Sequence, residues 1–305
     1  MIEKLEMLLA LASERHFGRA AEAVGVTQQT LSAAIKQLEE RLGVLLVQRG
    51  SRFGGFTPEG EKALDWARRI VGDVRAMRQD LRTLRRDLTG HLRIAAIPTA
   101  LPVLASLTTP FRARHPGVRF TIRSATSATI LSMLVNLEAD VGLTYLNNEP
   151  LGRVTAVPLY RESYRLLTAP DAPLGRREAV TWAEVADIPL CLLTPDMQNR
   201  RIIDARLRAA GGEPSPSLES NSMIVLMTHV RTGRWASVMP ALLAEVLGPT
   251  EQVRAIPIHD PDPPYTIGLV APHRDPPLPV VGAFVAEARE AAHRLDADLA
   301  AEAAR

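Results

Sequence analysis

Cysteine is almost absent from this chain of 305 residues, in which Cys191 is the only one. A single thiol cannot form an internal disulfide, so a redox switch would need a second subunit or an oxidised acid form of that thiol. Cys191 also lies within the apolar run IPLCLL (188–193), a pattern typical of a buried strand. The sequence therefore favours a structural role for this residue over a sensing role.

Long hydrophobic runs and a strong excess of one charge are also missing. No apolar run approaches the roughly 20 residues that cross a bilayer, and the N-terminal segment carries acidic residues among its leucines with no small-residue cleavage site. We therefore expect a cytoplasmic protein without membrane contact, and not an exported binding protein. The net charge is only +2, so nucleic-acid binding must rest on positioned residues and not on bulk charge.

Signatures of catalysis and metal binding are absent too. The seven histidines are scattered singly and show no metal-ligand spacing. The sequence contains no Gly-x-Ser-x-Gly, no His-Glu-x-x-His, no glycine-rich phosphate loop and no dinucleotide fingerprint. We predict no metal, no cofactor and no enzymatic activity, and keep an enzyme on a two-lobed anion-binding fold as a less favoured alternative.

The most informative stretch is residues 20–60, whose pattern predicts a helix, a tight turn, a second helix and a glycine-rich hairpin. Gly25 stands where the chain must turn sharply between the two helices. Apolar residues at helical spacing form one predicted buried seam: Ala21, Val24, Leu31, Ala34, Ile35, Leu38 and Leu42. This pattern is typical of a helix-turn-helix, although a small helical core with a solvated polar face would give the same signal.

The outward face of the second helix has the chemistry of a groove-reading surface. Its N-cap is Thr27, its amides can pair with adenine edges, and its hydroxyls can meet bases or phosphates. The segment 49–56 then predicts a wing, anchored by Phe53 and Phe56, whose tip arginine reaches a phosphate or a narrow minor groove. The candidate DNA-binding residues are Thr27, Gln28, Gln29, Thr30, Ser32, Lys36, Arg49 and Arg52.

A dense set of positions in the first 60 residues carries a family pattern: Ala20, Ala21, Val24, Val26, Thr27, Gln28, Ser32, Ile35, Leu38, Glu39, Leu42, Gly43, Leu46, Arg49, Arg52, Thr57 and Gly60. They resemble the LysR-type transcriptional regulators. That family usually has Ser at Thr27, Phe at Val47 and Ala at Glu59, and these departures touch capping and packing more than groove chemistry. The resemblance implies a winged helix-turn-helix, an effector-binding half and control of transcription.

A long helix is predicted from Pro58 to about Leu88, ended by Gly90. Its apolar residues recur in alternating steps of four and three, the heptad seam of a coiled coil. Such a stripe could lie against its own domain, but so long a helix has too little chain nearby to cover it, and a second copy is the predicted cover. The candidate dimerisation residues are Ile70, Val74, Met77, Leu81, Leu84 and Leu88, preceded by Ala63 and Ala67.

Beyond Gly90 strands and helices alternate, which predicts a β-α-β-α-β unit with a parallel sheet, followed by a second unit from about residue 161. Predicted strands lie at 92–97, 118–124, 141–146, 164–168, 188–193, 236–240, 253–258 and 266–271. Predicted helices lie at 99–114, 127–139, 196–210, 222–231 and 280–303. The strand at 266–271 and the last helix are predicted to return to the first unit. Two α/β lobes joined by crossing strands look like the type 2 periplasmic-binding-protein fold, the effector-binding half of LysR-type proteins.

The predicted fold is therefore α/β with three parts. Residues 1–57 form a winged helix-turn-helix, residues 58–89 a coiled-coil linker helix, and residues 90–305 a two-lobed, type 2 periplasmic-binding-protein-like effector domain. Lobe I comprises about 90–160 and 266–305, and lobe II about 161–265.

The cleft between the lobes is the predicted ligand site, because open α/β sheets bind ligands where strands end and helices begin. Two helices of lobe I are expected to start there with free N–H groups, so a small anion is the predicted effector class. Thr99 and Ser127 stand at these starts and, by resemblance, match effector-contacting hydroxyls of the family, whereas capping alone would also account for both. The candidate effector-binding residues are Thr99, Ser127, Thr129, Thr194 and Gln198.

These patterns predict a regulator that binds double-stranded DNA at an inverted repeat as a homodimer, or as the homotetramer that the resemblance implies. RNA polymerase is a further candidate partner. The alternative is an architectural DNA-binding protein or repressor whose C-terminal half only oligomerises. Where the family often has Gly-x-Gly, this chain has Gly233-Arg234-Trp235, and the bulky indole suggests a smaller ligand space.

Overall fold

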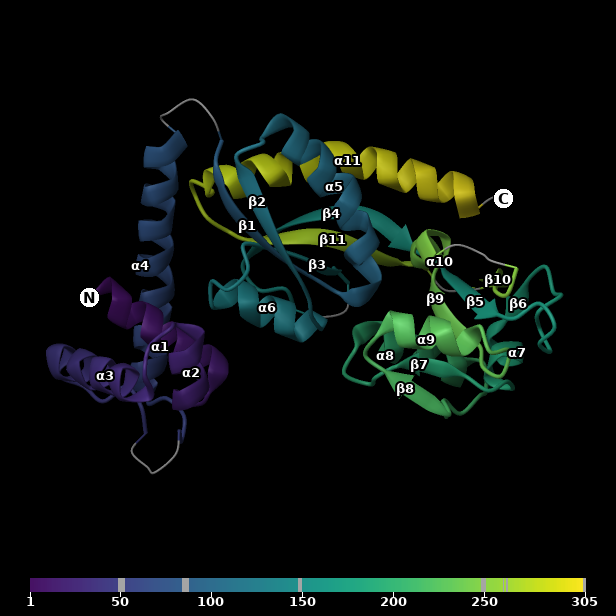
Figure 1. The fold of residues 1–305 in the computed structure, drawn as a ribbon, viewed down its shortest axis with the longest axis horizontal. Helices are drawn as coiled ribbons and strands as arrows, with labels where there is room; N and C mark the ends of the chain where they lie inside the picture. Colours follow the sequence, from purple (N-terminus) through teal and green to yellow (C-terminus); the bar gives the residue numbers. More distant parts are fainter. Residues whose placement is uncertain are drawn as a thin grey trace.

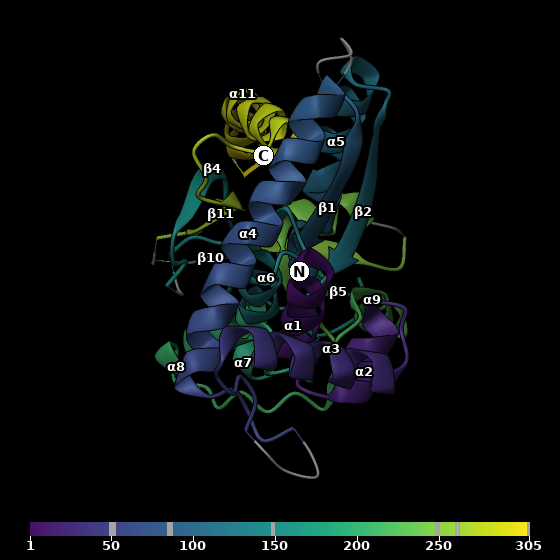
Figure 2. The same ribbon diagram turned by 90° about the vertical axis from the view of Figure 1, so that its left-hand side faces the viewer.

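The computed structural model describes residues 1–48, 53–83, 88–147, 150–247, 251–259, 261 and 263–303. Figure 1 shows a small helical domain at the N-terminus, the long helix α4 (Pro58–Thr83) rising from it, and two α/β lobes beyond. Turned by 90°, the same ribbon shows α4 running alongside the first lobe (Figure 2). Within the described part of the chain, no helix combines the length and apolarity needed to cross a membrane.

The helical domain has a leucine-rich core shared by its own helices and the first turns of α4. Leu31 and Leu38 are fully buried there, in agreement with the predicted seam, and Leu8 of the first helix is buried with them. The seam ends one turn early, because Leu42 is 46% exposed, and the prediction that it is buried is wrong. Gly25 has a φ of 71° in the turn between two helices, a conformation that side chains disfavour. The helices are α1 (Ile2–Glu14), α2 (Phe17–Ala23) and α3 (Gln28–Leu42).

Helix α4 begins as the sequence predicts. The hydroxyl of Thr57 accepts from the N–H of Gly60 at 2.9 Å and donates to the carbonyl of Leu45 at 2.6 Å, which caps the helix and ties it to the preceding strand segment. The far end differs from the prediction. The described helix ends at Thr83, and Leu88 lies outside it, packed against the core of the first lobe. Gly90 begins a strand and does not cap a helix.

Lobe I is a five-stranded sheet in the order β2-β1-β3-β11-β4. Strand β1 pairs in parallel with β2 and β3, which confirms the predicted parallel unit, while β11 runs antiparallel to β3 and β4. The strands are β1 (Gly90–Ala96), β2 (Val118–Ser124), β3 (Val141–Tyr145), β4 (Val154–Glu162) and β11 (Tyr265–Pro272). The helices are η1 (Pro98–Ala100), α5 (Leu101–Arg114), α6 (Ser127–Val135) and α11 (Pro279–Ala303).

Strand β4 is missed by the sequence analysis. Pro158 interrupts its apolar pattern, and a proline argues against a central strand. The structure explains why proline is tolerated: β4 is the edge strand of the sheet, so the missing N–H breaks no pairing on its open side. The return of β11 between β3 and β4 is the predicted one.

Lobe II has a four-stranded sheet in the order β6-β10-β5-β9 and a separate pair, β7-β8. A bridge between Leu190 and Ala236 joins the pair to β9. The strands are β5 (Tyr164–Thr168), β6 (Val180–Thr181), β7 (Cys191–Leu193), β8 (Leu218–Ser220), β9 (Ser237–Pro240) and β10 (Arg254–His259). The helices are α7 (Trp182–Ala186), α8 (Gln198–Ala209), α9 (Met223–Val230) and α10 (Ala241–Leu247).

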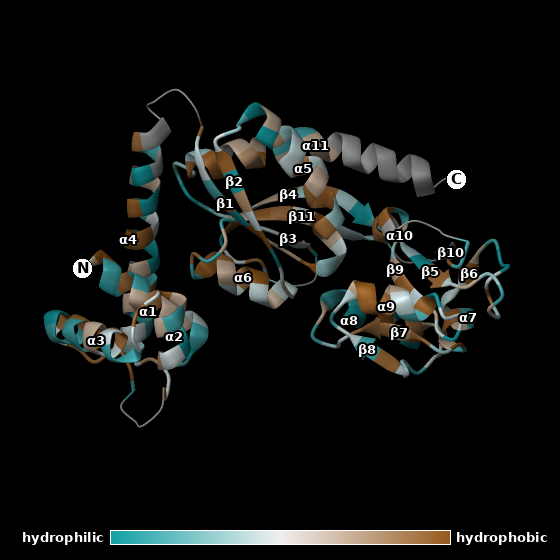
Figure 3. Ribbon diagram, viewed as in Figure 1, coloured by the Kyte–Doolittle hydropathy of each residue, from teal (hydrophilic) through white to brown (hydrophobic). Residues whose placement is uncertain are grey.

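The hydropathy of the ribbon follows this layering. Hydrophobic residues gather on strands such as β11 and β7 and on α9, whereas α4 alternates hydrophobic and hydrophilic turns (Figure 3). The chain passes between the lobes twice, from β4 into β5 and from β10 into β11. Lobe I is therefore built from two separate stretches of sequence.

Gly60→Ala is expected to destabilise the helical domain. A Cβ at Gly60 would lie 2.0 Å from the carbonyl oxygen of Leu46, so the helix or the strand segment must shift, and overpacking of this kind costs about 1–3 kcal/mol. Gly54→Ala is the matched control, because its Cβ would meet nothing closer than 3.5 Å. Chemical denaturation should show a lower free energy of unfolding for Gly60→Ala alone, and equal losses in both variants would contradict this account.

Candidate functional site

The outward face of α3 presents all six of its candidate residues to solvent: Thr27, Gln28, Gln29, Thr30, Ser32 and Lys36. Thr27 caps the helix as predicted, since its Oγ1 accepts from the N–H of Thr30 at 3.1 Å. The two threonine hydroxyls also bond each other at 2.9 Å. Gln29 and Ser32 have no partner among the residues that the structure describes, so their polar groups are open to a groove.

The wing is visible through its two arms. Val47 and Phe56 form an antiparallel bridge, and the N–H of Gln48 donates to the carbonyl of Gly55 at 3.0 Å. The ring of Phe53 stands edge-on to that of Phe56 at 5.2 Å, which fits their predicted role as anchors. The candidate residues Arg49 and Arg52, of which Arg52 is the predicted tip, lie outside the described residues.

One carboxylate that the sequence analysis did not single out positions the wing. Glu39 on α3 accepts from the N–H groups of Leu46 and Val47 at 2.8 and 3.1 Å. These bonds fix the first arm of the wing to the recognition helix. The family pattern contains Glu39, but only the fold shows which backbone groups its side chain meets.

Helix α4 carries one apolar stripe that its own domain does not cover. Trp66, Ile70, Met77 and Leu81 are 57%, 40%, 55% and 60% exposed. Val74 is half-buried, Leu84 lies outside the described residues, and Ala67 is fully buried in the helical domain. The exposed stripe thus begins at Trp66 and continues through Ile70, Met77 and Leu81. The sequence analysis did not select Trp66, because the neighbouring Ala67 fits the heptad repeat.

Two hydroxyls of lobe I are buried without partners. Thr99 and Ser127 are 1% and 2% exposed, and neither side-chain oxygen has a hydrogen-bond partner. The N–H of Ala125 donates to the carbonyl of Ala96 at 3.0 Å, so the segments leading to both residues run side by side at the carboxyl edge of the sheet. The hydroxyl of Thr144, at the end of β3, is also buried and unpartnered.

The expectation that Thr99 and Ser127 cap helices is wrong. Thr99 lies inside the short helix η1, and α5 has Ala100 at its N-cap position without a side-chain bond. The cap of α6 is Thr126, whose Oγ1 accepts from the N–H of Thr129. Neither hydroxyl is therefore used to cap a helix start.

The start of α6 keeps more backbone N–H groups than the start of α5 does. Pro98 and Pro102 remove N–H groups near the start of α5. At α6 the N–H groups of residues 129 and 130 bond Thr126. Those of Ser127 and Ala128 keep the free, partly positive character of a helix N-terminus.

The other candidates are placed differently from one another. Thr129 is exposed, and its hydroxyl bonds that of Thr126 at 2.9 Å. Gln198 is turned to Arg201, which donates to its side-chain oxygen. Thr194 has a buried, unpartnered hydroxyl, as Thr99 has. The structure therefore gives Thr194 the environment of a ligand contact and gives Thr129 and Gln198 local partners.

Asn199 and Arg200 were not selected from the sequence and prove to be buried. Asn199 is 4% exposed, and its amide nitrogen has no hydrogen-bond partner. Arg200 is equally buried and donates to Asp204 at 2.7 Å, Glu219 at 2.6 Å and the carbonyl of Leu193 at 2.7 Å. Its charge is neutralised within lobe II by Asp204 and Glu219.

A buried carboxyl lies where β4 crosses towards lobe II. Glu162 is 2% exposed and accepts from the hydroxyls of Tyr145 in lobe I at 2.6 Å and Tyr164 in lobe II at 2.8 Å. Burial raises the pKa of Glu162 to about 7, although these hydroxyls favour the ionised form. One carboxyl thus joins side chains of both lobes.

Two family descriptions match the chain. "Bacterial regulatory helix-turn-helix protein, lysR family" matches residues 2–61, and "LysR substrate binding domain" matches residues 85–293. The chain is a LysR-type transcriptional regulator. It binds DNA through the N-terminal domain and carries an effector-binding domain, as the sequence predicts.

Relatives of this LysR-type regulator cover most of its length. It is 31% identical over 270 residues to "DNA-binding transcriptional dual regulator OxyR" of Escherichia coli (strain K12), with 88% of each chain covered. A full-length OxyR variant from Pseudomonas aeruginosa has a TM-score of 0.71 and 25% identity over 94% of this chain and 93% of that one. CbnR complexed with its target DNA has a TM-score of 0.61 and 20% identity over 96% and 100%, which shows the fold alone.

Two residues singled out in the sequence of this LysR-type regulator belong to the packing of lobe II. The indole of Trp235 donates to the hydroxyl of Ser217 at 2.9 Å and stands edge-on to His229 at 5.4 Å. Cys191 is fully buried, its thiol donates to the carbonyl of Leu226, and burial raises its pKa to about 11. The structural role predicted for Cys191 fits this environment.

Glu162→Gln is expected to remove a pH dependence of stability. The pKa of Glu162 is raised from an ordinary 4.5 to about 7 on folding, so the folded state binds more protons than the unfolded state between these values, and stability falls as the pH rises through them. At pH 8 the glutamine variant should be more stable than the wild type by about 1–3 kcal/mol. Below pH 4.5 the two should converge.

Denaturation curves recorded from pH 4 to 8 provide the measurement. Glu213→Gln, which changes an exposed carboxylate in lobe II, is the control and should follow the wild type throughout. A wild-type stability that rises across the window from pH 4.5 to 7, with no difference from Glu162→Gln, would show that the carboxyl is not held in this way.

Proposed function

We propose that this regulator responds to a small anion of single negative charge bound at the carboxyl edge of the lobe I sheet. The observation that carries the proposal is the pair of buried, unpartnered hydroxyls of Thr99 and Ser127. A buried hydroxyl without a partner is costly, and a ligand oxygen would remove that cost. The free N–H groups at the start of α6 add a partly positive field for the same ligand.

The charge of the effector follows from the groups around it. Hydroxyls and one helix terminus supply only partial positive charge. After β7 the two arginines are engaged: Arg200 by Asp204 and Glu219, and Arg201 by Gln198 and the carbonyl of Asp196. A ligand with two or three negative charges would need a free cation to offset its desolvation, so a monovalent carboxylate or a similar ion fits better.

The functional division follows from the parts described above. We take residues 1–57 as the DNA-reading unit, 58–89 as the linker and 90–305 as the sensor, with lobe I at about 90–160 and 266–305 and lobe II at about 161–265. Two copies joined along α4 would hold two recognition helices about a two-fold axis, which favours an inverted repeat in the DNA. Closure of the lobes on the anion would change the angle between the reading units and hence transcription.

Several relatives are named "Hydrogen peroxide-inducible genes activator", and one similar structure is a Corynebacterium glutamicum OxyR cysteine-to-serine mutant with hydrogen peroxide bound (TM-score 0.61, 25% identity). We infer a different signal for this chain. A peroxide-reactive thiol must be accessible and ionised, whereas Cys191 is the only cysteine, is fully buried and has a raised pKa. Thiol oxidation therefore does not suit this regulator.

Thr99→Val is expected to abolish stabilisation by the effector while leaving DNA binding intact, because valine keeps the shape and removes the hydroxyl. The measurement is the melting temperature of the wild type and variant with formate, acetate, malonate, succinate and sulfate. An anion at 100 times its Kd should stabilise the wild type by about 2.7 kcal/mol. Thr129→Val is the control, since that hydroxyl is exposed and bonds Thr126.

A Thr99→Val protein that keeps the full thermal shift would show that the pocket is misplaced. Stabilisation by malonate, succinate or sulfate but not by the monovalent anions would contradict the assigned charge. No stabilisation by any anion would favour the architectural alternative, in which the C-terminal half only oligomerises.

Met77→Asp is expected to weaken self-association through α4. The side chain of Met77 is 55% exposed on the uncovered stripe, and in a dimer two carboxylates would be buried near each other, raising the dimer dissociation constant at least about 100-fold. Arg78→Asp is the matched control, because Arg78 is exposed on the same helix beside the stripe. Sedimentation equilibrium measures both, and equal association of Met77→Asp and the wild type would place the dimer contact elsewhere.

A further inference from the structure

The turn between α6 and β3 is where lobe I touches the DNA-binding domain. Leu137 in this turn belongs to lobe I in sequence but packs against the hydrophobic core of the helical domain. Its backbone has a φ of 60°, in the left-handed region that a leucine rarely adopts. The turn therefore holds an unfavourable conformation, and the surrounding contacts must maintain it.

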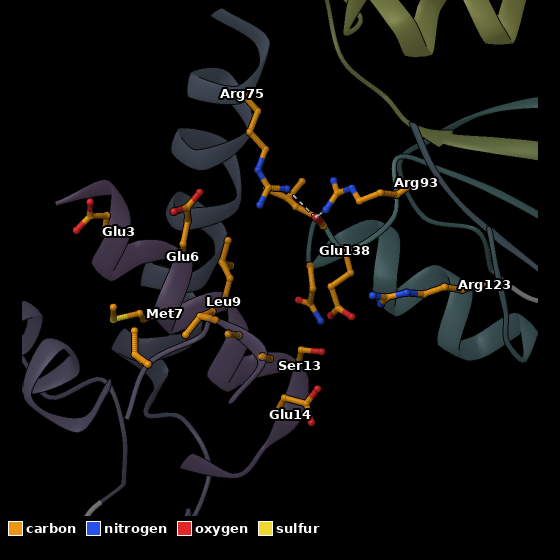
Figure 4. Close-up of a pocket in the computed structure, with 16 residues that line it drawn as sticks. Glu3, Glu6, Met7, Leu9, Ser13, Glu14, Arg75, Arg93, Arg123 and Glu138 are labelled. Carbon is orange, nitrogen blue, oxygen red and sulfur yellow. Dashed lines mark hydrogen bonds between the residues drawn. The ribbon is translucent and has the colours of Figure 1, made fainter. Parts of the chain in front are cut away.

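Three arginines maintain the turn. Arg75 of α4 and Arg93 of β1 both donate to the carbonyl of Leu137, at 2.7 and 2.6 Å. Arg68, two turns before Arg75 on α4, donates to the side-chain oxygen of Asn136 at 3.2 Å. Figure 4 shows Arg75 reaching down from α4 and Arg93 reaching across from the sheet to meet at this turn. The linker helix and the sheet of lobe I thus each donate a hydrogen bond to the carbonyl of Leu137.

The charges at this contact make it sensitive to separation. Burial and the neighbouring Arg93 lower the pKa of Arg75, while Glu6 of α1 and Asp140 act in the opposite direction. Arg93 is itself paired with both carboxylate oxygens of Asp140, at 3.0 and 2.6 Å. Because two guanidinium groups share one acceptor, movement of the turn changes the environment of both charges.

Among the described residues, a cavity lies between the α1 face of the DNA-binding domain and this side of lobe I. This cavity has a volume of about 670 Å³ and is lined by both charged and apolar side chains. Glu3, Glu6 and Glu14 line it from α1, and Arg123 and Glu138 line it from lobe I (Figure 4). Leu137 lines this cavity and packs against the helical core, so it supplies an apolar contact between the domain and the lobe.

Helix α6 links this contact to the buried hydroxyl of Ser127. Ser127 is its first residue and Val135 its last, and one face is buried through Ile130 and Leu134. Nine residues at 1.5 Å each make a rod of about 13 Å. A short packed helix moves as a unit, so a ligand that draws on Ser127 at one end displaces Leu137 just beyond the other.

We propose that Leu137 and Arg75 are positioning residues that transmit the state of the effector pocket to the DNA-binding domain through α6. At its effector end the inference rests on the function proposed above. Neither residue touches DNA or ligand: Leu137 sets the seat of the helical domain on lobe I, and Arg75 ties α4 to the same turn. Occupancy of the pocket and binding of DNA bias the same contact, and the coupling is reciprocal.

The first test uses DNA alone and needs no effector. Amide hydrogen exchange is measured for residues 127–140 of the full-length protein with and without a duplex selected from genomic fragments by the wild type. We expect the duplex to change exchange rates in this segment about five-fold or more in the wild type. The change should be lost in Leu137→Asn, which tolerates the left-handed backbone but removes the apolar contact, and in Arg75→Gln.

Arg78→Gln is the control on the same helix, since Arg78 bonds no group of lobe I among the residues described, and it should behave as the wild type does. Circular dichroism and melting temperature establish that each variant is folded, and the two variants act on different sides of the contact. A wild type whose exchange in 127–140 is unchanged by DNA, or a Leu137→Asn and Arg75→Gln pair that both keep the change, would overturn the proposal.

The second test uses whichever anion of the panel stabilises the wild type. Leu137→Asn and Arg75→Gln should keep the thermal shift given by that anion but lose its effect on the Kd for DNA, whereas Thr99→Val should lose both. Variants in which the anion still changes DNA affinity as in the wild type would contradict the inference. If no anion stabilises the wild type, the proposed effector fails, and the exchange measurement still decides the role of the turn.

Discussion

The pairing of β11 with β3 and β4 is the constraint on which the two-lobed body depends. This strand enters the sheet antiparallel to both neighbours and brings the end of the chain, including α11, back to lobe I. Lobe II is therefore inserted between β4 and β11 and is tied to lobe I at two crossings. The two connections, from β4 to β5 and from β10 to β11, restrict the relative motion of the lobes to a hinge. A hinge is the motion that closes a cleft around a ligand.

Some polar groups near the hinge have hydrogen-bond partners in this structure, and others do not. Glu162 accepts hydrogen bonds from tyrosines of both lobes on one oxygen, and Asn199 of lobe II also favours its ionised form, while the hydroxyls of Thr99 and Ser127 lack partners among the described residues. Buried polar groups of folded proteins are almost always paired. In the function proposed above, a bound anion would reduce the cost of leaving the hydroxyls of Thr99 and Ser127 unpartnered. Specificity would then come from hydroxyl geometry, because the arginines near the pocket are already engaged.

Local sequence patterns predict much of this architecture. The features that the sequence analysis misses depend on contacts between residues far apart in the chain. The helix-turn-helix and the start of α4 follow from periodicity and helix-start chemistry, whereas the predicted return of β11 agrees with the two-lobed fold that the family resemblance implies. Strand β4 is hidden by Pro158, which is tolerated only because the strand lies at an edge. The roles of Thr99 and Ser127 as caps fail because Thr126 and a short 3-10 helix take over the helix starts. The burial of Arg200 depends on Glu219, which only the fold brings near.

In the mechanism proposed above, the strained turn at Leu137 would let a weak ligand shift the equilibrium between two conformations of the regulator. A leucine with left-handed backbone costs about 1–2 kcal/mol, and hydrogen bonds from charged donors contribute about 1.5–3 kcal/mol each. Because Arg75 and Arg93 share one carbonyl, loss of either bond brings these opposing contributions close to balance. A contact near balance responds to a bias of a few kcal/mol, which is the order of free energy that a small anion gains from two hydroxyls and a helix terminus. A deeper, unstrained contact would be more stable and would transmit nothing.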